Sequence, residues 1–192
     1  MKLVLATHNP GKVKEFRNAF SSFGVEILTG ADVGAPEPEE TGNSFHDNAL
    51  IKALATYRHS GIPSLADDSG LCVNALGGDP GVHSADWAGP DKDFVKAMRE
   101  IKDRLEGHED WSASFKCVLA FVCRPDDPEY FEGQMDGKIV WPPRGNHGFG
   151  YDPFFVPDER PDKTLAELDV EDKQALSHRG RAIQSFVTNK LT

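Results

Sequence analysis

The stretch KLVLATHNPGKVKEFRNAF, residues 2–20, sets the pattern of the fold, because a strand, a turn and a helix follow one another in it. Residues 2–7 are apolar after Lys2, as in a buried strand. The polar segment Thr7-His8-Asn9-Pro10-Gly11-Lys12 has the composition of a turn. Beyond it, apolar side chains recur at helical spacing, at Val13, Phe16, Ala19 and Phe20. We therefore expect a strand, a polar loop and a helix.

Outward from this unit, apolar patterns predict further strands and helices. Strands are expected at 25–28, at 63–66, at 71–76 after a polar turn formed by Asp67-Asp68-Ser69-Gly70, and in a hairpin of 113–123 and 130–141. Helices are expected at about 43–58, at 91–105 with a buried stripe of Phe94, Val95, Met98, Ile101 and Leu105, and in a closing segment that carries Leu176, Ile183, Phe186, Val187 and Leu191. No internal repeat or long linker divides the sequence.

The composition excludes several classes of protein. The chain has 192 residues, of which 39% are hydrophobic and 27% charged, as in ordinary globular proteins. Its formal net charge of −10 argues against binding to a long nucleic acid. No apolar run reaches the roughly 20 residues of a membrane helix, and the N-terminus does not resemble a signal peptide. With three cysteines and no paired spacing, reduced thiols and a cytoplasmic location are expected.

The loop from Thr7 to Lys12 is a candidate anion site. A strand that leads through a Gly-containing turn into a helix presents free backbone N–H groups, and Lys12 adds a positive charge. It is not a Walker A loop, because Val13 stands where Ser or Thr would be needed. An ordinary turn with a helix cap remains the alternative interpretation.

Two acidic pairs are candidate ligands for magnesium, which proteins usually hold with a few carboxylates, waters and substrate phosphates. These pairs are Glu39-Glu40, before a predicted helix, and Asp67-Asp68, at the end of a predicted strand. Neighbouring strand residues point to opposite faces, so one of Asp67 and Asp68 is expected to reach a given ion. The other would face solvent or a helix N-terminus. Each pair alone fits a solvated acidic turn equally well.

Two further segments offer groups for a planar ligand. In Phe149-Gly150-Tyr151-Asp152, an aromatic on a glycine-rich loop is well placed to stack on a ring. Lys173 and Ser177-His178-Arg179 form a cluster of donors. In one unbroken helix Lys173 and His178 would be about 140° apart, so a shared ligand requires a break. Ser177 is a plausible cap for a helix that starts at His178, and a solvated helical face is the alternative.

Taken in order, these segments resemble the motif series of the inosine triphosphate pyrophosphatase family. The series is Thr7-His8-Asn9-Pro10-Gly11-Lys12, Glu39-Glu40-Thr41-Gly42, Ala66-Asp67-Asp68-Ser69-Gly70, Phe149-Gly150-Tyr151-Asp152-Pro153 and Ser177-His178-Arg179-Gly180. The resemblance covers essentially the whole chain. It implies hydrolysis of non-standard purine nucleoside triphosphates, (d)ITP and XTP, to the monophosphate and pyrophosphate.

The resemblance also implies an α/β fold with a long mixed, twisted central sheet, helices on both faces, and two lobes around an active-site cleft. One domain would span residues 1–192, usually as a homodimer. The family's phosphate loop falls on Thr7, His8, Asn9, Pro10, Gly11 and Lys12, with Lys52 and Ser69 as further phosphate contacts. Mg²⁺ would be held by Glu40 and Asp68, and Asp68 would also accept the proton. Base recognition falls on Phe149, Gly150, Tyr151, Asp152, Lys173, His178 and Arg179.

One segment departs from the family pattern. Asp86-Trp87 stands where an Arg-Tyr pair is common, so a cation is replaced by an acid. Whatever that arginine does for substrate or partner subunit is therefore in doubt.

Two rival functions remain open from the sequence. One is a pyrophosphatase for other modified nucleotides, such as modified pyrimidines. The other is a non-catalytic nucleotide sensor or a protein that binds damaged bases within DNA. The presence of both Glu40 and Asp68 argues against a sensor, and the net charge argues against DNA.

Overall fold

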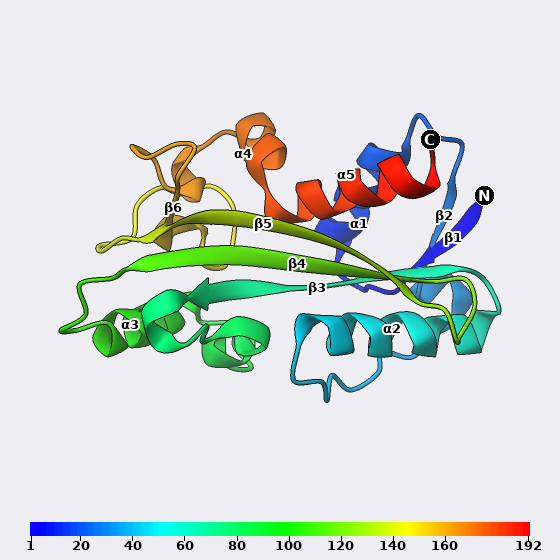
Figure 1. The fold of residues 1–192 in the computed structure, drawn as a ribbon, viewed down its shortest axis with the longest axis horizontal. Helices are drawn as coiled ribbons and strands as arrows, with labels where there is room; N and C mark the ends of the chain where they lie inside the picture. Colours follow the sequence, from blue (N-terminus) through cyan, green and yellow to red (C-terminus); the bar gives the residue numbers. More distant parts are fainter. The chain divides into compact units, whose positions relative to one another are not determined.

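The structure is a computed structural model that describes the backbone of residues 1–192 and every side chain except those of Val170 and Gln174. Its helices and strands, in chain order, are β1 (Lys2–Leu5), α1 (Pro10–Phe20), β2 (Glu26–Thr29), α2 (Phe45–Ser60), β3 (Ser64–Val73), α3 (Phe94–Arg104), β4 (Ser112–Val122), β5 (Glu129–Ile139), β6 (Phe155–Pro157), α4 (Val170–Leu176) and α5 (His178–Lys190) (Figure 1). Among the described residues, no helix combines the length and the apolarity that crossing a membrane would need.

Within the described residues, six strands form one sheet in the order β2-β1-β3-β4-β5-β6. β1 runs parallel to both β2 and β3, with Leu5 paired to Thr29 on one side and to Leu65 on the other. β6 is antiparallel to β5, with Ile139 opposite Phe155. The sheet is therefore mixed, and the expected α/β class is confirmed.

The chain divides into two compact units. The first consists of Met1–Asp68, Cys117–Gly133 and Arg181–Thr192, and the second consists of Ser69–Lys116 and Gln134–Gly180. The boundary falls inside β3, β4 and β5, so each unit contains part of these strands.

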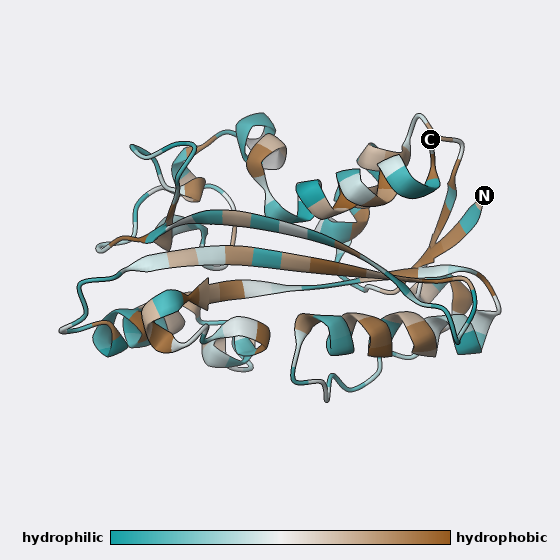
Figure 2. Cartoon of the chain, viewed as in Figure 1, coloured by the Kyte–Doolittle hydropathy of each residue, from teal (hydrophilic) through white to brown (hydrophobic). Residues whose placement is uncertain are grey.

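The first unit has apolar residues on both faces of its strands. One cluster joins α1 and α5 to alternate strand residues such as Leu65 and Leu119, and Phe186 lies at its centre. The other cluster joins α2 to the intervening residues, including Ala66 and Ala120. α2 accordingly alternates hydrophobic and hydrophilic residues along its length (Figure 2). Alternation along each strand thus buries both faces, as expected for a sheet covered by helices on each side.

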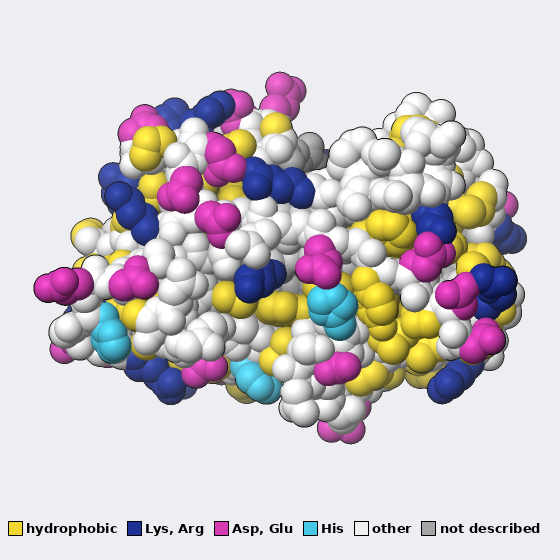
Figure 3. Space-filling view, viewed as in Figure 1, with side chains coloured by type: hydrophobic (Ala, Val, Ile, Leu, Met, Phe, Trp, Pro, Cys, Tyr) yellow, Lys and Arg dark blue, Asp and Glu magenta, His cyan; other side chains and the backbone are white. Residues whose placement is uncertain are grey.

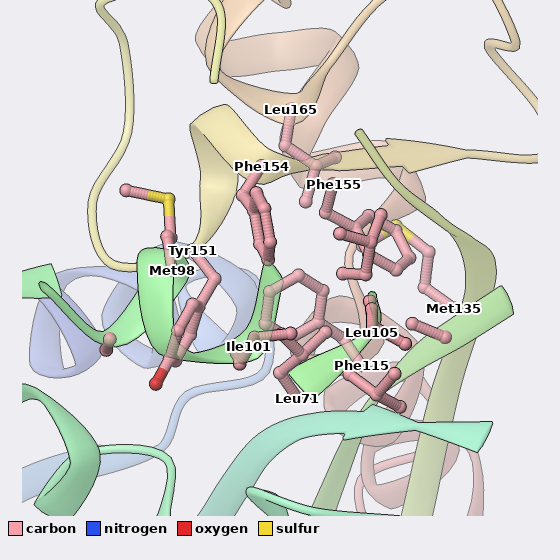
Figure 4. Packing of buried hydrophobic residues seen from close by; sticks show 14 of the residues in the cluster. Leu71, Met98, Ile101, Leu105, Phe115, Met135, Tyr151, Phe154, Phe155 and Leu165 are labelled. Carbon is pink, nitrogen blue, oxygen red and sulfur yellow. The ribbon is translucent and has the colours of Figure 1, made fainter. Parts of the chain in front are cut away.

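The second unit has one large apolar cluster. It brings α3 together with the end of β3, the start of β4, β5 and the segment from Tyr151 to Leu168. Phe115 and Phe155 meet edge to face with ring centroids 4.8 Å apart. Figure 4 shows the Tyr151 ring at the edge of the drawn part of this cluster, with its hydroxyl oxygen turned away from the neighbouring apolar side chains.

Three local expectations need correction or confirmation. The polar turn at 67–70 is wrong, because β3 continues without interruption from Ser64 to Val73. Its polar side chains remain in the strand because they are buried with partners rather than solvated. Val95 is wrongly placed in the buried stripe of α3, since it is 59% exposed and Ala97 is buried instead. The break before His178 is confirmed, and the Ser177 hydroxyl accepts a hydrogen bond from the Gly180 N–H.

Phe186→Ala tests the first apolar cluster. The Phe186 ring is fully buried and meets Phe20, Phe121 and Phe131 with centroids 5.2–5.4 Å away. Its truncation should lower the free energy of unfolding by about 3–5 kcal/mol, through lost burial and the remaining cavity. Urea denaturation measures the change.

Phe23→Ala is the matched control, because Phe23 is 36% exposed and should cost at most about 1 kcal/mol. Equal losses for the two variants would contradict the placement of Phe186 at the centre of the cluster.

Candidate active site

The middle of β3 places two adjacent carboxylates on opposite faces of the sheet. Leu65 belongs to the cluster with α1 and α5, and Ala66 belongs to the cluster with α2. By the same alternation, Asp67 faces α1 and Asp68 faces α2. Their ion pairs follow this pattern, since Asp67 pairs with a lysine of α1 and Asp68 with a lysine of α2. The expectation that the two carboxylates diverge is met. Of the two expected surroundings for the second carboxylate, solvent and a helix N-terminus, Asp67 has the second, because it faces Lys12 in the first turn of α1.

Lys52 of α2 joins the two proposed metal ligands. Its ammonium donates to Asp68 Oδ1 at 3.0 Å and to Glu40 Oε1 at 3.2 Å. Burial lowers the pKa of Lys52, but the carboxylates of Asp68, Asp67 and Glu40 outweigh it and leave that pKa raised. Burial raises the pKa of Asp68 to about 6, against the opposing effect of Lys52. Glu40, Lys52 and Asp68 thus form one electrostatic group.

The loop from Thr7 to Lys12 is capped by its own side chains. Asn9 is the N-cap of α1, and its Oδ1 accepts from the N–H groups of Gly11 and Lys12. Thr7 Oγ1 accepts from the Asn9 N–H at 3.1 Å. His8 Nδ1 lies 3.3 Å from Glu37 Oε2, and both residues line a small pocket with Thr7 and Lys52. The helix-cap interpretation therefore describes the local geometry. The positive charge of Lys12 keeps the loop suitable for an anion.

The group around Asp68 fits a divalent cation whose coordination shell is completed by ligands from outside the protein. Asp68 Oδ2 is buried and has no hydrogen-bond partner among the described residues, so an oxygen is available there. No set of three or more His, Cys, Asp or Glu side chains suitable for a metal occurs among the described residues. Two carboxylates that rely on water and phosphate oxygens match the preference of magnesium for few protein ligands.

In the second unit, Asp152 organises the glycine-rich loop. Its Oδ2 accepts from the Phe149 N–H at 2.7 Å and from Lys173 Nζ at 2.6 Å. Lys173 Nζ also lies 4.8 Å from the centroid of the Phe149 ring, which is 62% exposed. At Gly148, with φ +78°, a β-carbon would come within 2.1 Å of Asp152 Oδ2. The structure therefore brings Phe149, Asp152 and Lys173 together and leaves one aromatic face exposed beside a cation.

His178 and Arg179 begin α5 but have different partners. The His178 ring stacks on Phe115, with centroids 5.0 Å apart and planes inclined by 15°. Arg179 is buried, and its guanidinium donates to Ser69 Oγ at 3.1 Å. Arg179 is thus joined to a predicted phosphate contact, next in sequence to Asp68. The apolar pattern places Phe115 in a predicted strand, and no sequence motif identifies it as a support for His178.

Tyr151 has a supporting position within the predicted base-recognition segment. It is buried, meets Phe94 edge to face, and its hydroxyl donates to the Ser84 carbonyl at 2.8 Å. The Ser84 hydroxyl in turn accepts from the Leu71 N–H. At Gly70 a β-carbon would lie 2.2 Å from the Gly81 carbonyl oxygen, so this approach of β3 to the loop requires glycine. Tyr151 therefore links its loop to the strand that carries Ser69.

The segment Asp86-Trp87, which departs from the family pattern, makes its contacts within the second unit. Asp86 Oδ2 lies 2.9 Å from His83 Nδ1. Trp87 is partly buried against the apolar cluster, and the Arg104 guanidinium lies 4.2 Å from its ring centroid. The indole is therefore less available to a partner subunit than a tryptophan on a surface loop would be.

Comparisons with known proteins agree over nearly the whole chain. The model of the Ham1 family matches residues 3–189. The dITP/XTP pyrophosphatase of Gluconobacter oxydans is 46% identical over 190 residues, which cover 99% of this chain and 91% of the relative. That of Zymomonas mobilis is 48% identical, covering 97% and 90%. A HAM1 protein structure from Coxiella burnetii superposes with a TM-score of 0.93 at 38% identity, covering 98% of each chain. The chain therefore belongs to the Ham1 family.

Proposed function

We propose that the protein hydrolyses non-standard purine nucleoside triphosphates, dITP, ITP, dXTP and XTP, to the nucleoside monophosphate and pyrophosphate. It is a nucleoside triphosphate pyrophosphatase that removes such nucleotides from the pool. The observation that carries the proposal is the buried Asp68, which pairs with Lys52 and has no hydrogen-bond partner for Oδ2 among the described residues, while Lys52 also pairs with Glu40. The names of the relatives from Gluconobacter oxydans and Zymomonas mobilis support the substrate class.

In the proposed reaction a water molecule attacks the α-phosphorus. The new bond joins the water oxygen to that phosphorus, and the bond to the bridging oxygen of the β-phosphate breaks. Asp68 accepts the proton of the water, and pyrophosphate leaves with the electron pair. Lys12, Lys52 and the loop from Thr7 to Gly11 bind the negative oxygens, with Ser69 as a further phosphate contact. The protein depends on a metal ion, proposed to be Mg²⁺ on Glu40 and Asp68, which would supply charge neutralisation at the phosphates.

Base selection is proposed to rest on donors in the second unit. Phe149 would stack on the purine, and the 6-keto oxygen of hypoxanthine or xanthine would accept from Lys173, His178, Arg179 or a backbone N–H. Gly150, Tyr151 and Asp152 would shape this recognition. A 6-amino group would meet a donor instead, and each mispaired buried group costs about 1–3 kcal/mol. This energetic cost disfavours adenine nucleotides.

The remaining proposals concern context. One domain would span residues 1–192 and act in the cytoplasm, where the nucleotide pool is located. Basic and acidic side chains are interspersed on the face drawn in Figure 3, and the net charge is −10, so a small nucleotide suits this protein better than a nucleic acid. A homodimer through the region around Asp86-Trp87 remains a proposal, which rests on the resemblance and on the tryptophan of this loop. Sedimentation at micromolar concentration would reject it by showing a monomer.

Asp68→Asn tests the assigned base and metal ligand. Wild-type protein should release pyrophosphate from dITP and dXTP in a nucleotide panel, and only with magnesium present. The variant should lose activity by at least about 10³-fold, because both the proton acceptor and an anionic ligand are removed.

Asp32→Asn is the control, because Asp32 is an exposed carboxylate that bonds within its own turn. The Asp68→Asn variant should fold, because the raised pKa of Asp68 shows that burial disfavours its charged form. Residual Asp68→Asn activity within tenfold of wild type would refute the assignment.

A pH profile tests the protonation of Asp68. Because its pKa of about 6 lies above the ordinary 3.8, folding favours the neutral acid. Its contribution to stability is complete below the lower value and is lost as the pH rises through about 6. Activity needs the ionised form, so kcat/KM should fall on acidification through this range at low magnesium. More magnesium should move the fall to lower pH, because the cation favours the carboxylate.

Steady-state profiles at two magnesium concentrations measure this effect. An acidic limb that is independent of magnesium would contradict a metal ligand at Asp68, and full activity in excess EDTA would refute the metal requirement.

Arg179→Ala and Lys12→Met separate base recognition from phosphate binding. If Arg179 donates to the 6-keto oxygen, its loss should lower kcat/KM for dITP by about 10–200-fold and affect dATP much less. Lys12→Met should lower both by similar factors, because both substrates carry the same triphosphate. Steady-state kinetics of both variants on both substrates decide. Equal losses for Arg179→Ala would assign it to the phosphate side, together with its partner Ser69.

A further inference from the structure

Asp67 is a buried charge that the proposed chemistry does not use. Its side chain is 1% exposed, and it lies on the face of β3 opposite to Asp68, in the row that contains Leu65. A carboxylate so far from water is costly unless it is paired. Lys12 Nζ lies 2.9 Å from Asp67 Oδ2, while the Lys12 side chain is 22% exposed. The pair therefore connects the interior of the first unit to the first turn of α1.

Stability alone does not account for this pair. Buried ion pairs contribute little net stability, and apolar residues of similar volume often replace them without loss. The preceding position of this row, Leu65, belongs to an apolar cluster, while the next, Ser69, is polar and bonded to Arg179. A charge at this position therefore points to a task that an apolar residue cannot perform.

Lys12 gains a fixed orientation from the contact. A lysine side chain has many rotamers, and its ammonium carries three donors. The 2.9 Å contact with Asp67 engages one donor and limits the side chain to the rotamers that reach the strand. Two donors are left for an anion in front of the Thr7–Gly11 segment. Because the order is established before a ligand arrives, the Lys12 side chain loses less entropy when the ligand binds.

We infer that Asp67 is a positioning residue, which holds the Lys12 ammonium in place to receive the triphosphate of the substrate. This inference rests on the proposed function, because it takes Lys12 as a phosphate ligand. Asp67 itself touches no reacting atom. It acts on the substrate through Lys12, in contrast to Asp68 on the other face.

A double-mutant cycle tests the inference, with dITP as substrate. Asp67→Asn keeps the shape of the side chain but weakens its hold on Lys12, so KM should rise about tenfold as the ordering cost moves to the binding step. The value of kcat should stay within about threefold, because bound phosphates then hold the ammonium themselves. In a Lys12→Met background, Asp67→Asn should change kcat/KM by less than about twofold.

Binding of inorganic tripolyphosphate, followed by calorimetry, gives a readout without turnover. Asp67→Asn and Lys12→Met should weaken it, and the double variant should bind no more weakly than Lys12→Met. Lys14→Met, an exposed lysine of the same helix, should leave both kinetics and binding unchanged.

Asp67→Leu combined with Lys12→Met covers the case in which Asp67→Asn fails to fold. An apolar pair should keep the melting temperature and show the kinetics of Lys12→Met alone. The inference is overturned if the effects of Asp67→Asn and Lys12→Met multiply, or if Asp67→Asn lowers kcat with KM unchanged, as a disturbance of Asp68 would. Absence of dITP turnover in the wild-type protein would instead refute the proposed function, while the tripolyphosphate cycle still tests the pair.

Discussion

The site depends on one constraint, which is that two adjacent carboxylates are buried in the middle of a strand. Alternation along β3 sends Asp67 toward α1 and Asp68 toward α2, so each needs a cation from a different helix. Lys12 and Lys52 meet this need and thereby fix both helices against the strand by their charges as well as by apolar contacts. With Glu40, this local group carries three acids against two bases. A polyanion is therefore best received in company with additional positive charge, as a metal complex provides.

The sequence predicted the class of fold and most elements because apolar periodicity reports burial directly. Hence the helices around Phe16 and Ala49 and the two long strands β4 and β5 lie close to where they were expected. The same signal failed at 67–70, where four polar or glycine residues predicted a turn inside what is one strand. Propensity treats such residues as solvated. It contains no information about the lysines, distant in sequence, that allow the carboxylates to be buried.

Prediction of the candidate site from the sequence is limited in the same way, because partners distant in sequence are not visible in it. Glu40 and Asp68 were recognisable as candidate ligands because they are acidic residues close to glycines, and Lys173 was recognisable because it belongs to a cluster of donors. The roles of Asp67, Phe115 and Ser84 could not be read from the sequence, because each acts through a neighbour supplied by the fold. Tyr151 illustrates the converse. It belongs to a recognisable segment, yet its ring is buried and its hydroxyl is bonded to a carbonyl. Motifs identify segments, and packing decides which member of a segment faces outward.

The cap on α1 affects which anions can bind at this helix N-terminus in a solution of mixed salts. Asn9 already satisfies the N–H groups of Gly11 and Lys12, so an incoming anion must compete with a tethered amide oxygen rather than enter an open cradle. Chloride or a single inorganic phosphate brings too little charge and too few contacts to win that exchange reliably. A triphosphate chain engages several donors at once, and its effective local concentration favours displacement. If the loop binds the substrate's phosphates as proposed, it would therefore select multivalent anions over abundant small ions.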